Sequence, residues 1–449
     1  MNVEILNIHL ADRLAGKLFR FDNGTTQPLI RYVADEKFAL DKQQDVLSLG
    51  MRALSSDLQT SFWFDVKRAE FNGQNSRLPT FFQNMLPEGL FRTQLAQERG
   101  CREDDHFGLF AACGLDLPGA IKALPANVSR TELAHLITQD QDALEMSVTA
   151  DPLPFGVSIS GMQPKLGLIE QGGRYVARKR VGSTRIIGKL PQVDRPMLPE
   201  VEHLSLTMAA AAGATVCTHK LEPLTKLSIK HGYTLGGSSN FLAVTRFDRD
   251  DSKRIHCEDF AQALNIDPQN KYTGATYAAM AGLMMRFPES LGISAVHELL
   301  RLITINELLG NYDAHLKNFC LIYPDGKNPV LAPAFDIVAW TAYISGQGNA
   351  LSIYRDTTSP RALPSALNKR DKVGALTALS LREFCNRVGI VEKPSAAVIK
   401  ATVSRAIETW PVLIERSSIL STQKEKVLKH FYEHPFVQQQ LVRKVSKSS

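Results

Sequence analysis

The 449 residues include 52 lysines and arginines against 46 aspartates and glutamates, which gives a formal net charge of +6. A content of 44% hydrophobic and 22% charged residues is typical of a soluble globular protein of two or three domains. The six cysteines are scattered without a C-x-x-C pair, which argues against a zinc site or a disulfide framework. No apolar run reaches the roughly 18 residues of a membrane span, and the N-terminus lacks signal-peptide features. We therefore expect a cytoplasmic protein without contact to membranes.

The first 125 residues predict a compact α+β unit. Strands are expected at Asn2–Leu10 and Lys17–Phe21, and Asn23-Gly24 is a hairpin signal. A helix is expected over Leu78–Glu98, interrupted at Pro87 because proline lacks the amide hydrogen that a helix interior uses. These elements form the first of three expected domains.

A second domain, residues 126–250, is expected to be rich in strands. It opens with a polar stretch holding a possible helix at Arg130–Gln139, and the closely spaced prolines of Asp151–Pro154 mark the clearest break. A helix over Val201–Ala212 should end at Gly213, a typical C-terminal cap. Strands are expected at Val157–Ser160, Leu166–Glu170, Arg174–Lys179, Thr184–Leu190, Lys220–Leu224 and Asn240–Phe247.

The third domain, residues 251–449, is predicted to be almost wholly helical. Pro411 and Pro435 should bend or split two of its helices. A small β-rich part followed by a larger helical part is the order of a bilobal, protein-kinase-like α+β fold, here with an extra N-terminal α+β subdomain. The C-terminal helices are expected at Leu376–Val388, Ala396–Ile414 and Lys424–Val442.

A candidate catalytic loop runs from Asn311 to Asn318, with Asp336 downstream. A protein kinase catalytic loop likewise has an Asp, four intervening residues and an Asn, followed by a metal-binding Asp. In that chemistry Asp313 orients or deprotonates the attacking hydroxyl, while Asn318 and Asp336 offer hard oxygens to Mg²⁺. The spacing alone also fits a turn or a helix cap, since Asp and Asn are common in both.

The loop from Ser158 to Lys165 is a candidate phosphate-binding loop. Gly161 permits close approach of the backbone to a ligand, and loop amides and serine hydroxyls can donate to phosphate oxygens. Lys165 would add a positive charge. The loop matches neither a Walker A motif nor a kinase glycine-rich loop, and by itself it is better explained as an ordinary hairpin turn.

Lys189 is the one charged residue in the otherwise apolar segment Ile186–Pro191 of an expected strand. Its ammonium group is expected to point into a cleft, as the strand lysine of a kinase does, and Glu202 on the next helix could pair with it. Because Gly188 and Pro191 flank it, Lys189 can equally mark the end of an edge strand.

The segment Val244–Arg249 lies where the β-rich part meets the helical part. Its backbone could pair with adenine at a hinge between two lobes. Arg246, Asp248 and Arg249 could also form an ion network that braces the joint, and the two interpretations are compatible.

Together these segments resemble the HipA family of serine/threonine kinases, the toxin components of bacterial toxin–antitoxin pairs. The resemblance runs through nearly the whole chain. Each motif is ordinary by itself, but their order is highly specific. The motifs are Phe81–Glu88, Asp116–Ala120, Ser160–Lys165, Gly188–Pro191, Arg246–Arg249, Glu258–Phe260, Gly310–Asn318 and Leu331–Asp336.

The resemblance implies a role for each matching position. Asp313 matches the catalytic Asp, Asn318 and Asp336 match the metal ligands, and Lys189 matches the lysine that holds the nucleotide phosphates. The segment from Thr245 to Phe247 matches the adenine hinge, although the position of Thr245 is often acidic in the family. The residues implied in nucleotide binding are Ser160, Gly161, Met162, Gln163, Lys165, Lys189, Thr245, Phe247, His315 and Lys317.

The family autophosphorylates a serine of the phosphate loop, which ejects the loop and disables nucleotide binding. Ser158 aligns with that serine, and Ser160 forms a double-serine motif with it, as in a subset of the family. A phosphate at either serine would add nearly two negative charges where the phosphates of ATP must lie. His315 and Lys317 could help to hold phosphate, or they could support the loop structurally.

The resemblance further implies ATP and Mg²⁺ as cofactors and a growth-arresting kinase. Its protein substrate would be a translation protein such as an aminoacyl-tRNA synthetase. A small DNA-binding antitoxin of the HipB type would restrain it, and DNA would be contacted only through that antitoxin. Two other functions are compatible with the sequence: a small-molecule kinase on a similar scaffold, and a catalytically silent co-repressor bound to an antitoxin. The intact set of Lys189, Asp313, Asn318 and Asp336 argues against the silent module.

Overall fold

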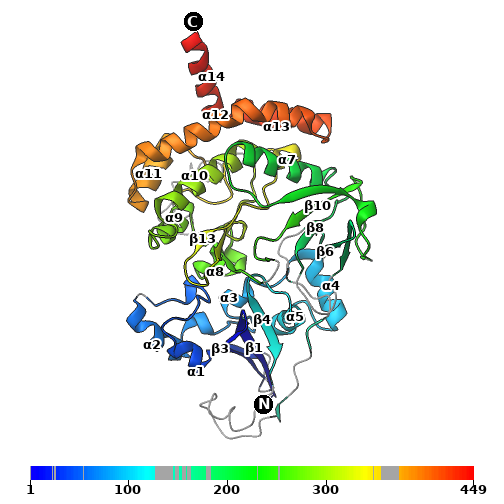
Figure 1. Cartoon of the computed structure of the whole chain (residues 1–449), viewed down its shortest axis with the longest axis vertical. Helices are drawn as coiled ribbons and strands as arrows, with labels where there is room; N and C mark the ends of the chain where they lie inside the picture. Colours follow the sequence, from blue (N-terminus) through cyan, green and yellow to red (C-terminus); the bar gives the residue numbers. More distant parts are fainter. Residues whose placement is uncertain are drawn as a thin grey trace.

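The computed structural model stacks the chain from an N-terminal α+β part to a layer of C-terminal helices (Figure 1). The middle of the molecule holds a second sheet on one side and the first helices of the helical part on the other (Figure 1). The structure describes residues 2–22, 24, 27–53, 55–126, 145–146, 151–153, 158, 163–177, 184–229, 231–250, 253–346, 348–354 and 374–448.

The N-terminal sheet has the strand order β3-β2-β1-β4, and β5 pairs with β1 in parallel. Strands β1 and β2, and β2 and β3, are antiparallel neighbours, so the predicted strands and the hairpin that follows β2 are confirmed. Buried apolar side chains lie on both faces of β1: Leu6, Ile8 and Leu10 on one face and Val3 and Ile5 on the other. The strands are β1 (Asn2–Leu10), β2 (Arg13–Asp22), β3 (Leu29–Ala34), β4 (Ile121–Pro125) and β5 (Glu145–Met146).

Short helices enclose the aromatic core of this part. The ring centroids of Tyr32 and Phe82 are 5.3 Å apart, and those of Phe82 and Phe110 are 5.6 Å apart. The predicted interruption at Pro87 is confirmed, because one helix ends before it and another begins after it. The helices are α1 (Glu36–Leu40), α2 (Gln59–Phe64), α3 (Thr80–Gln83), α4 (Gly89–Arg99) and α5 (His106–Ala112).

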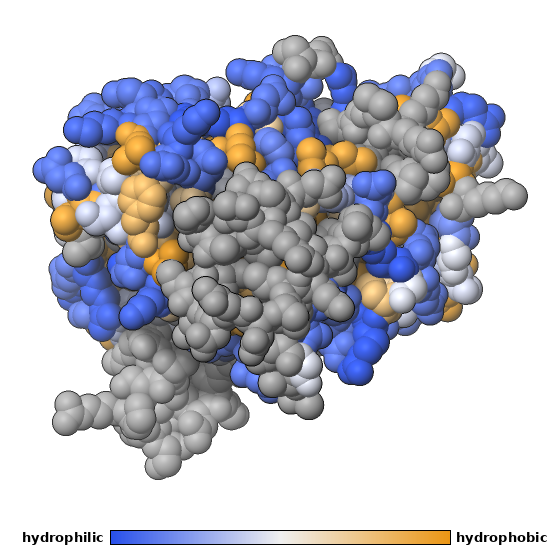
Figure 2. Space-filling model, turned by 90° about the horizontal axis from the view of Figure 1, so that it is seen from below, coloured by the Kyte–Doolittle hydropathy of each residue, from blue (hydrophilic) through white to orange (hydrophobic). Residues whose placement is uncertain are grey.

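The end of the molecule formed by the N-terminal part is mostly hydrophilic where described residues are visible (Figure 2). Its apolar side chains show as small, separate spots (Figure 2). Leu29, Leu40 and Leu58 are examples of exposed apolar residues in this part. Single exposed apolar residues of this kind are ordinary on protein surfaces.

The middle sheet has the order β7-β6-β8-β10-β9 and is antiparallel throughout. Helix α7 (Leu198–Ala211) packs against it, and Gly213 follows with a φ of +99°, so the helix ends near the predicted position. Of the strand predicted at 157–160 only Ser158 is described, and it lies in no strand. The helix predicted at Arg130–Gln139 lies outside the described residues. The strands are β6 (Lys165–Gln171), β7 (Arg174–Ala177), β8 (Ile186–Lys189), β9 (His219–Pro223) and β10 (Asn240–Thr245).

The helical part contains strands that the sequence analysis missed. A three-stranded sheet of β11 (His256–Asp259), β12 (Cys320–Tyr323) and β13 (Val330–Leu331) lies among its first helices. These strands are only two to four residues long, too short to show a periodic pattern. Strand β12 begins two residues after Asn318, so this small sheet carries the end of the candidate catalytic loop.

The C-terminal helices largely follow the prediction. The chain breaks between α13 and α14 at Pro435, as predicted, but Pro411 lies inside α12 without splitting it. Its neighbour Trp410 is fully buried and donates from Nε1 to the carbonyl oxygen of Met208 at 2.8 Å, so tertiary packing holds the helix together there. The helices are α8 (Phe260–Ala263), α9 (Tyr277–Met285), α10 (Gly292–Leu309), α11 (Ala378–Val388), α12 (Glu392–Arg416), α13 (Ser421–Glu433) and α14 (Pro435–Ser448).

Seven 3₁₀ turns connect these elements in the described residues. The turns are η1 (Leu49–Met51), η2 (Ser56–Leu58), η3 (Ala69–Phe71), η4 (Leu224–Lys226), η5 (Pro268–Asn270), η6 (Leu316–Asn318) and η7 (Trp340–Ala342).

None of the helices that the structure describes combines the length and the apolarity needed to cross a bilayer.

Buried apolar side chains form one large cluster that extends from α7 and β10 through α10 to α12. The N-terminal sheet and its helices have a separate cluster. The middle sheet is therefore anchored to the helical part by a shared core, to which the N-terminal part contributes Val46 and Leu49. The domain boundaries at residues 125 and 250 stay predictions.

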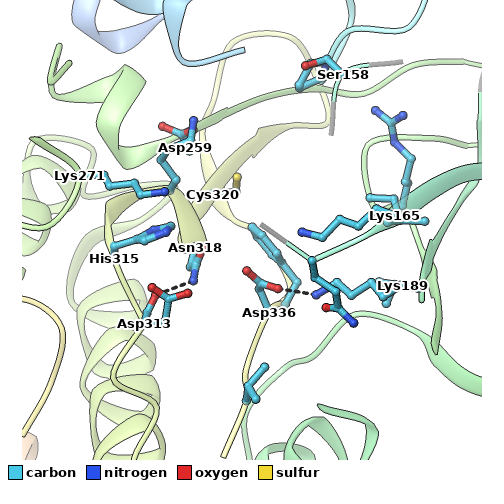
Figure 3. A pocket seen from close by; sticks show the side chains of 18 of the residues that line it. Ser158, Lys165, Lys189, Asp259, Lys271, Asp313, His315, Asn318, Cys320 and Asp336 are labelled. Carbon is cyan, nitrogen blue, oxygen red and sulfur yellow. Dashed lines mark hydrogen bonds and ion pairs between the residues drawn. The ribbon is translucent and has the colours of Figure 1, made fainter. Parts of the chain in front are cut away.

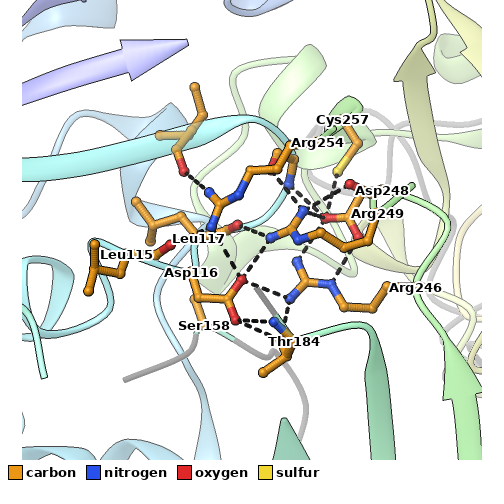
Figure 4. Close-up of polar contacts among 12 residues, drawn as sticks. Leu115, Asp116, Leu117, Ser158, Thr184, Arg246, Asp248, Arg249, Arg254 and Cys257 are labelled. Atoms are coloured by element: carbon orange, nitrogen blue, oxygen red, sulfur yellow. Dashed lines mark hydrogen bonds and ion pairs between the residues drawn. The ribbon is translucent and has the colours of Figure 1, made fainter. Parts of the chain in front are cut away.

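A buried ion network, here called the junction cluster, joins the N-terminal part to the rest (Figure 4). Asp116 accepts from Arg249 at 2.9 Å and Arg246 at 3.3 Å, and from the Thr184 hydroxyl at 2.7 Å. Asp248 accepts from Arg246 at 2.8 Å and Arg249 at 2.7 Å. The predicted bracing network is therefore confirmed. Its members are Asp116, Thr184, Arg246, Asp248, Arg249 and Arg254.

The junction cluster stays ionised because each charge has partners. Burial would raise the pKa of Asp116, but Arg246 and Arg249 hold it below the ordinary value. Removing one of the two carboxylates would leave the buried Arg246 and Arg249 with a single carboxylate between them, which is the costly way to break such a network.

We predict that Asp116→Asn lowers the free energy of unfolding by about 3–5 kcal/mol, because Arg246 and Arg249 lose a shared buried partner. The measurement is chemical denaturation. The control is Asp104→Asn, which breaks an exposed ion pair with Arg102 and should leave stability nearly unchanged. Equal stability of the two variants would contradict the bracing role.

Candidate active site

A cavity of about 700 Å³ lies where the middle sheet, the helical part and the N-terminal part meet. Figure 3 shows Asp313, His315 and Asn318 on one side of this cavity and Lys165, Lys189 and Asp336 on the other. Ser160, Gly161 and Met162 lie outside the described residues. The predicted site residues that line the cavity are Ser158, Gln163, Lys165, Lys189, Thr245, Phe247, Asp313, His315, Lys317, Asn318 and Asp336.

The C-terminal end of α10 determines where the candidate catalytic loop enters the cavity. The helix ends at Gly310, whose φ of +62° is the left-handed conformation that glycine adopts without strain. A Cβ atom there would also lie 2.2 Å from Thr341 Cγ2, so both backbone and packing require glycine. The chain then turns into the cavity, and His315 N donates to the carbonyl oxygen of Asp313 at 2.8 Å.

Asp313 is half-buried beside a tyrosine. The hydroxyl of Tyr272 donates to Asp313 Oδ1. Burial raises the pKa of Asp313 above the ordinary aspartate value, and the Tyr272 hydrogen bond opposes that shift. A carboxylate in this setting is a stronger base than an exposed one, which suits a group that must accept a proton.

Asn318 presents its amide oxygen rather than its nitrogen. Its Nδ2 donates to the carbonyl oxygen of Asp313 at 2.8 Å. Because the nitrogen is used in this way, the amide oxygen is left for another partner. An amide oxygen is a hard donor of the kind that Mg²⁺ prefers.

Asp336 adopts a left-handed backbone, with φ of +56°. This conformation is uncommon for residues other than glycine and costs on the order of 1 kcal/mol, and such positions concentrate at functional sites. The carboxylate of Asp336 accepts from the ammonium group of Lys189 (Figure 3). Burial would raise the pKa of Asp336, but Lys189 and Lys165 hold it well below the ordinary value.

Strand pairing brings Lys165 and Lys189 together. The two lysines are directly opposite in the β6–β8 ladder, so their side chains share one face of the sheet. Two like charges at such a position repel each other, and the carboxylates of Asp336 and Glu202 offset this because Lys189 pairs with both. The alternative that Lys189 only ends an edge strand is wrong, since β8 lies between β6 and β10.

The two lysines differ in their proton affinity. Burial lowers the pKa of Lys165. Burial also acts to lower the pKa of Lys189, but Asp336 and Glu202 outweigh it and raise the value above the ordinary one. Lys189 is therefore protonated at neutral pH, and it lies on the same side of the cavity as Lys165 and Asp336.

The predicted hinge lies at the end of β10. The backbone N–H of Thr245 donates to the Thr218 carbonyl at 2.8 Å, and that of Arg246 donates to the Arg185 carbonyl at 2.9 Å. These two N–H groups are thus committed within the protein. The ring centroids of Phe247 and Phe335 are 5.5 Å apart, and both residues line the cavity, where they form an apolar wall.

His315 and Lys317 differ in what their contacts suggest. The ammonium group of Lys317 is buried and donates to Asp259 at 2.9 Å and to the Asn84 carbonyl at 2.6 Å, which are contacts of a structural residue. Burial lowers the pKa of His315 to about 4, so its ring is neutral at pH 7, and its buried Nδ1 has no hydrogen-bond partner among the residues that the structure describes. Nucleotide binding by either residue stays a prediction.

Comparison with known proteins identifies the family. The model of the HipA-like C-terminal domain matches residues 157–410, and that of the HipA N-terminal domain matches residues 6–124. A putative kinase of Sinorhizobium fredii, Y4dM, is 30% identical over 416 residues, which cover 91% of each chain. The chain belongs to the HipA family.

This HipA family member is also similar to proteins of Shewanella oneidensis. The serine/threonine-protein kinase toxin HipA of that organism is 26% identical over 300 residues, 60% of this chain and 65% of that protein. A solved complex of Shewanella oneidensis HipA, HipB and operator DNA matches with a TM-score of 0.66 at 19% identity, covering 97% of this chain and 98% of the other. At this identity the likeness shows the fold, and the predicted α+β, kinase-like class is confirmed.

Several cavity residues of this HipA family member escaped the sequence analysis. Lys271 and Tyr272 line the cavity near Asp313, and Glu88 pairs with Lys271 at 2.9 Å. No local pattern marks these residues, because they come from segments far from the catalytic loop in the sequence. The motif Phe81–Glu88 was recognised, but nothing in the sequence indicated that it reaches the cavity.

We predict that Lys189→Met destabilises the protein by about 3 kcal/mol, because fully buried Glu202 and half-buried Asp336 lose their shared cation. Chemical denaturation measures the change. Adding Glu202→Gln to Lys189→Met should recover part of the loss by removing one of the two negative charges. Lys226→Met, in a more exposed pair with Glu222, is the control and should change stability little. Lack of recovery in the double variant would contradict this account.

Proposed function

We propose that this HipA family member is an ATP- and Mg²⁺-dependent serine/threonine protein kinase. The observation that carries the proposal is the convergence of Lys189, Asp313, Asn318 and Asp336 on one cavity. They come from a strand, a loop after a long helix, and a loop beyond the small sheet. A base, a fixed cation and two hard oxygen donors are the groups that phosphoryl transfer needs.

The donor set supports a hard divalent cation. The Asn318 amide is oriented by its nitrogen, and Asp336 is kept ionised by its neighbours. A group of three or more acidic, histidine or cysteine ligands is absent from the described residues, which suits an ion that keeps several waters. When bound, Mg²⁺ would neutralise negative charge on the nucleotide phosphates.

Each residue of the cavity then has a defined task. Asp313 would orient the acceptor hydroxyl and take its proton, while Tyr272 keeps the carboxylate in place. Lys189 would hold the phosphates with a charge that does not titrate near pH 7. Lys165, opposite Lys189 on the same face of the sheet, would add a second cation.

The apolar wall would accept adenine. Phe247 and Phe335 offer ring surface at the end of the hinge strand. Because the N–H groups of Thr245 and Arg246 are already used, a backbone contact to adenine at the hinge would go through a carbonyl oxygen or through Phe247 N–H. This refines the predicted hinge contact, which did not distinguish these atoms.

A self-phosphorylated loop serine is also part of the proposal. Ser158 is buried, its hydroxyl donates to the Met85 carbonyl, and its N–H donates to the Asp116 carbonyl at 3.1 Å. A phosphate cannot keep that hydroxyl donor and would bring nearly two negative charges into the buried site. Phosphorylation of Ser158 would therefore release the loop, in agreement with an off-switch.

The proposed setting is a toxin–antitoxin pair in the cytoplasm. The Shewanella oneidensis relative is named a kinase toxin, and its solved complex contains HipB and operator DNA. By analogy, the partner here would be a small DNA-binding antitoxin of the HipB type. The protein substrate would be a translation protein such as an aminoacyl-tRNA synthetase.

Asp313→Ala should abolish phosphate transfer and leave the fold intact, because the variant lacks the base but keeps the core. Purified protein is incubated with ATP and Mg²⁺ and its mass is measured. Asp57→Ala, at an exposed position of the N-terminal part, is the control and should gain phosphate like the wild type. Full activity of Asp313→Ala would refute the assignment. No gain in wild-type protein that starts unphosphorylated would favour a silent binding module.

The double variant Ser158→Ala/Ser160→Ala should lose self-phosphorylation, because both hydroxyls of the double-serine motif are removed. Peptide mass spectrometry after incubation with ATP and Mg²⁺ locates the phosphate. The single variants show which serine is the main acceptor. Phosphate found mainly at other residues of the double variant would overturn this site assignment.

A further inference from the structure

The segment Arg77–Glu88 of the N-terminal part lies against the active site. Three of its residues contact the stretch from Ile266 to Lys271, which precedes α9. Arg77 pairs with Asp267 at 3.2 Å, and Asn84 Nδ2 donates to the Ile266 carbonyl at 2.9 Å. Glu88 pairs with Lys271 at 2.9 Å, and both side chains are largely buried, at 23% and 17% exposure. The N-terminal part thus holds this stretch at both ends.

The held stretch leads directly to the candidate base. Tyr272 follows Lys271, and its hydroxyl donates to Asp313 Oδ1. The Lys271 carbonyl accepts from Leu316 N at 3.2 Å, which ties the stretch to the catalytic loop a second time. The Tyr272 ring also meets the His315 ring edge-on, with centroids 5.0 Å apart.

Lys317 forms a second connection between the N-terminal part and the candidate catalytic loop. This catalytic-loop lysine donates to the Asn84 carbonyl at 2.6 Å and to Asp259 at 2.9 Å. The same N-terminal segment therefore contacts the catalytic loop itself as well as the stretch that carries Tyr272. Residues of a catalytic loop need to be held to within a fraction of an ångström, so such contacts affect turnover directly.

We propose that Glu88 and Lys271 are positioning residues that hold the Tyr272 hydroxyl on Asp313, so that the N-terminal part sets the geometry of the catalytic base. The proposal rests on the function proposed for Asp313. The N-terminal part would thereby take part in catalysis. A partner that separated Glu88 from Lys271 would slow phosphate transfer by disturbing the position of the base.

The test uses full-length Glu88→Gln and Tyr272→Phe, with Glu98→Gln as a matched control at an exposed position of the same helical region. Self-phosphorylation rates are measured over a range of ATP concentrations. Glu88→Gln and Tyr272→Phe should lower the maximal rate about tenfold and leave the ATP concentration at half-maximal rate unchanged. The charge swap Glu88→Lys/Lys271→Glu should restore much of the rate. Residues that act only in folding would not lower the maximal rate while leaving the ATP concentration at half-maximal rate unchanged.

Hydrogen exchange gives a readout that does not depend on activity. Peptides covering Asn311–Asn318 should exchange faster in Glu88→Gln and Tyr272→Phe than in the wild type and in Glu98→Gln. Unchanged exchange in both variants would overturn the positioning role, as would a loss confined to ATP affinity. Inactive wild-type protein with altered exchange in the variants would instead refute the proposed kinase function and keep the structural coupling.

Discussion

The arrangement of the molecule depends on buried charges that must be paired across its parts. In the junction cluster, Asp116 from the N-terminal part meets Arg246 and Arg249 from the end of the hinge strand. Removing such ions from water costs several kcal/mol each, and only close, multiple partners offset that cost. The N-terminal part has its own apolar core and contributes Val46 and Leu49 to the large apolar cluster, so the polar joint adds to an apolar contact in fixing where this part sits.

The same constraint organises the cavity. Lys189 lies between Asp336 and Glu202, and Lys165 is its neighbour across the strand pair. The side chains are held in place before any ligand arrives, which is the arrangement that makes electrostatic stabilisation effective. The left-handed backbone of Asp336 is part of this arrangement, because it directs the carboxylate toward Lys189 at a small cost in strain.

The N-terminal part contributes contacts that reach the residues of the cavity. It contacts the candidate phosphate loop through Met85 and Ser158, and the candidate catalytic loop through Asn84 and Lys317. Through Glu88 it also reaches the stretch that holds Tyr272. A recognisable motif such as Phe81–Glu88 can therefore serve a site formed mainly by other parts of the chain.

The sequence by itself did not predict strands β3, β4 and β5, but it determined other local features: strands β1 and β2, the strands of the middle sheet, the helix interruption at Pro87, the helix end near Gly213, and the spacing of the candidate catalytic loop with Asp336 downstream. These follow from backbone restrictions and side-chain periodicity, which act over a few residues. Only the tertiary structure decided that Pro411 stays within a helix, where burial of Trp410 outweighs the lost hydrogen bond. It also decided which distant groups meet. Tyr272 reaches Asp313 only because the whole chain packs, and no local pattern encodes such a contact.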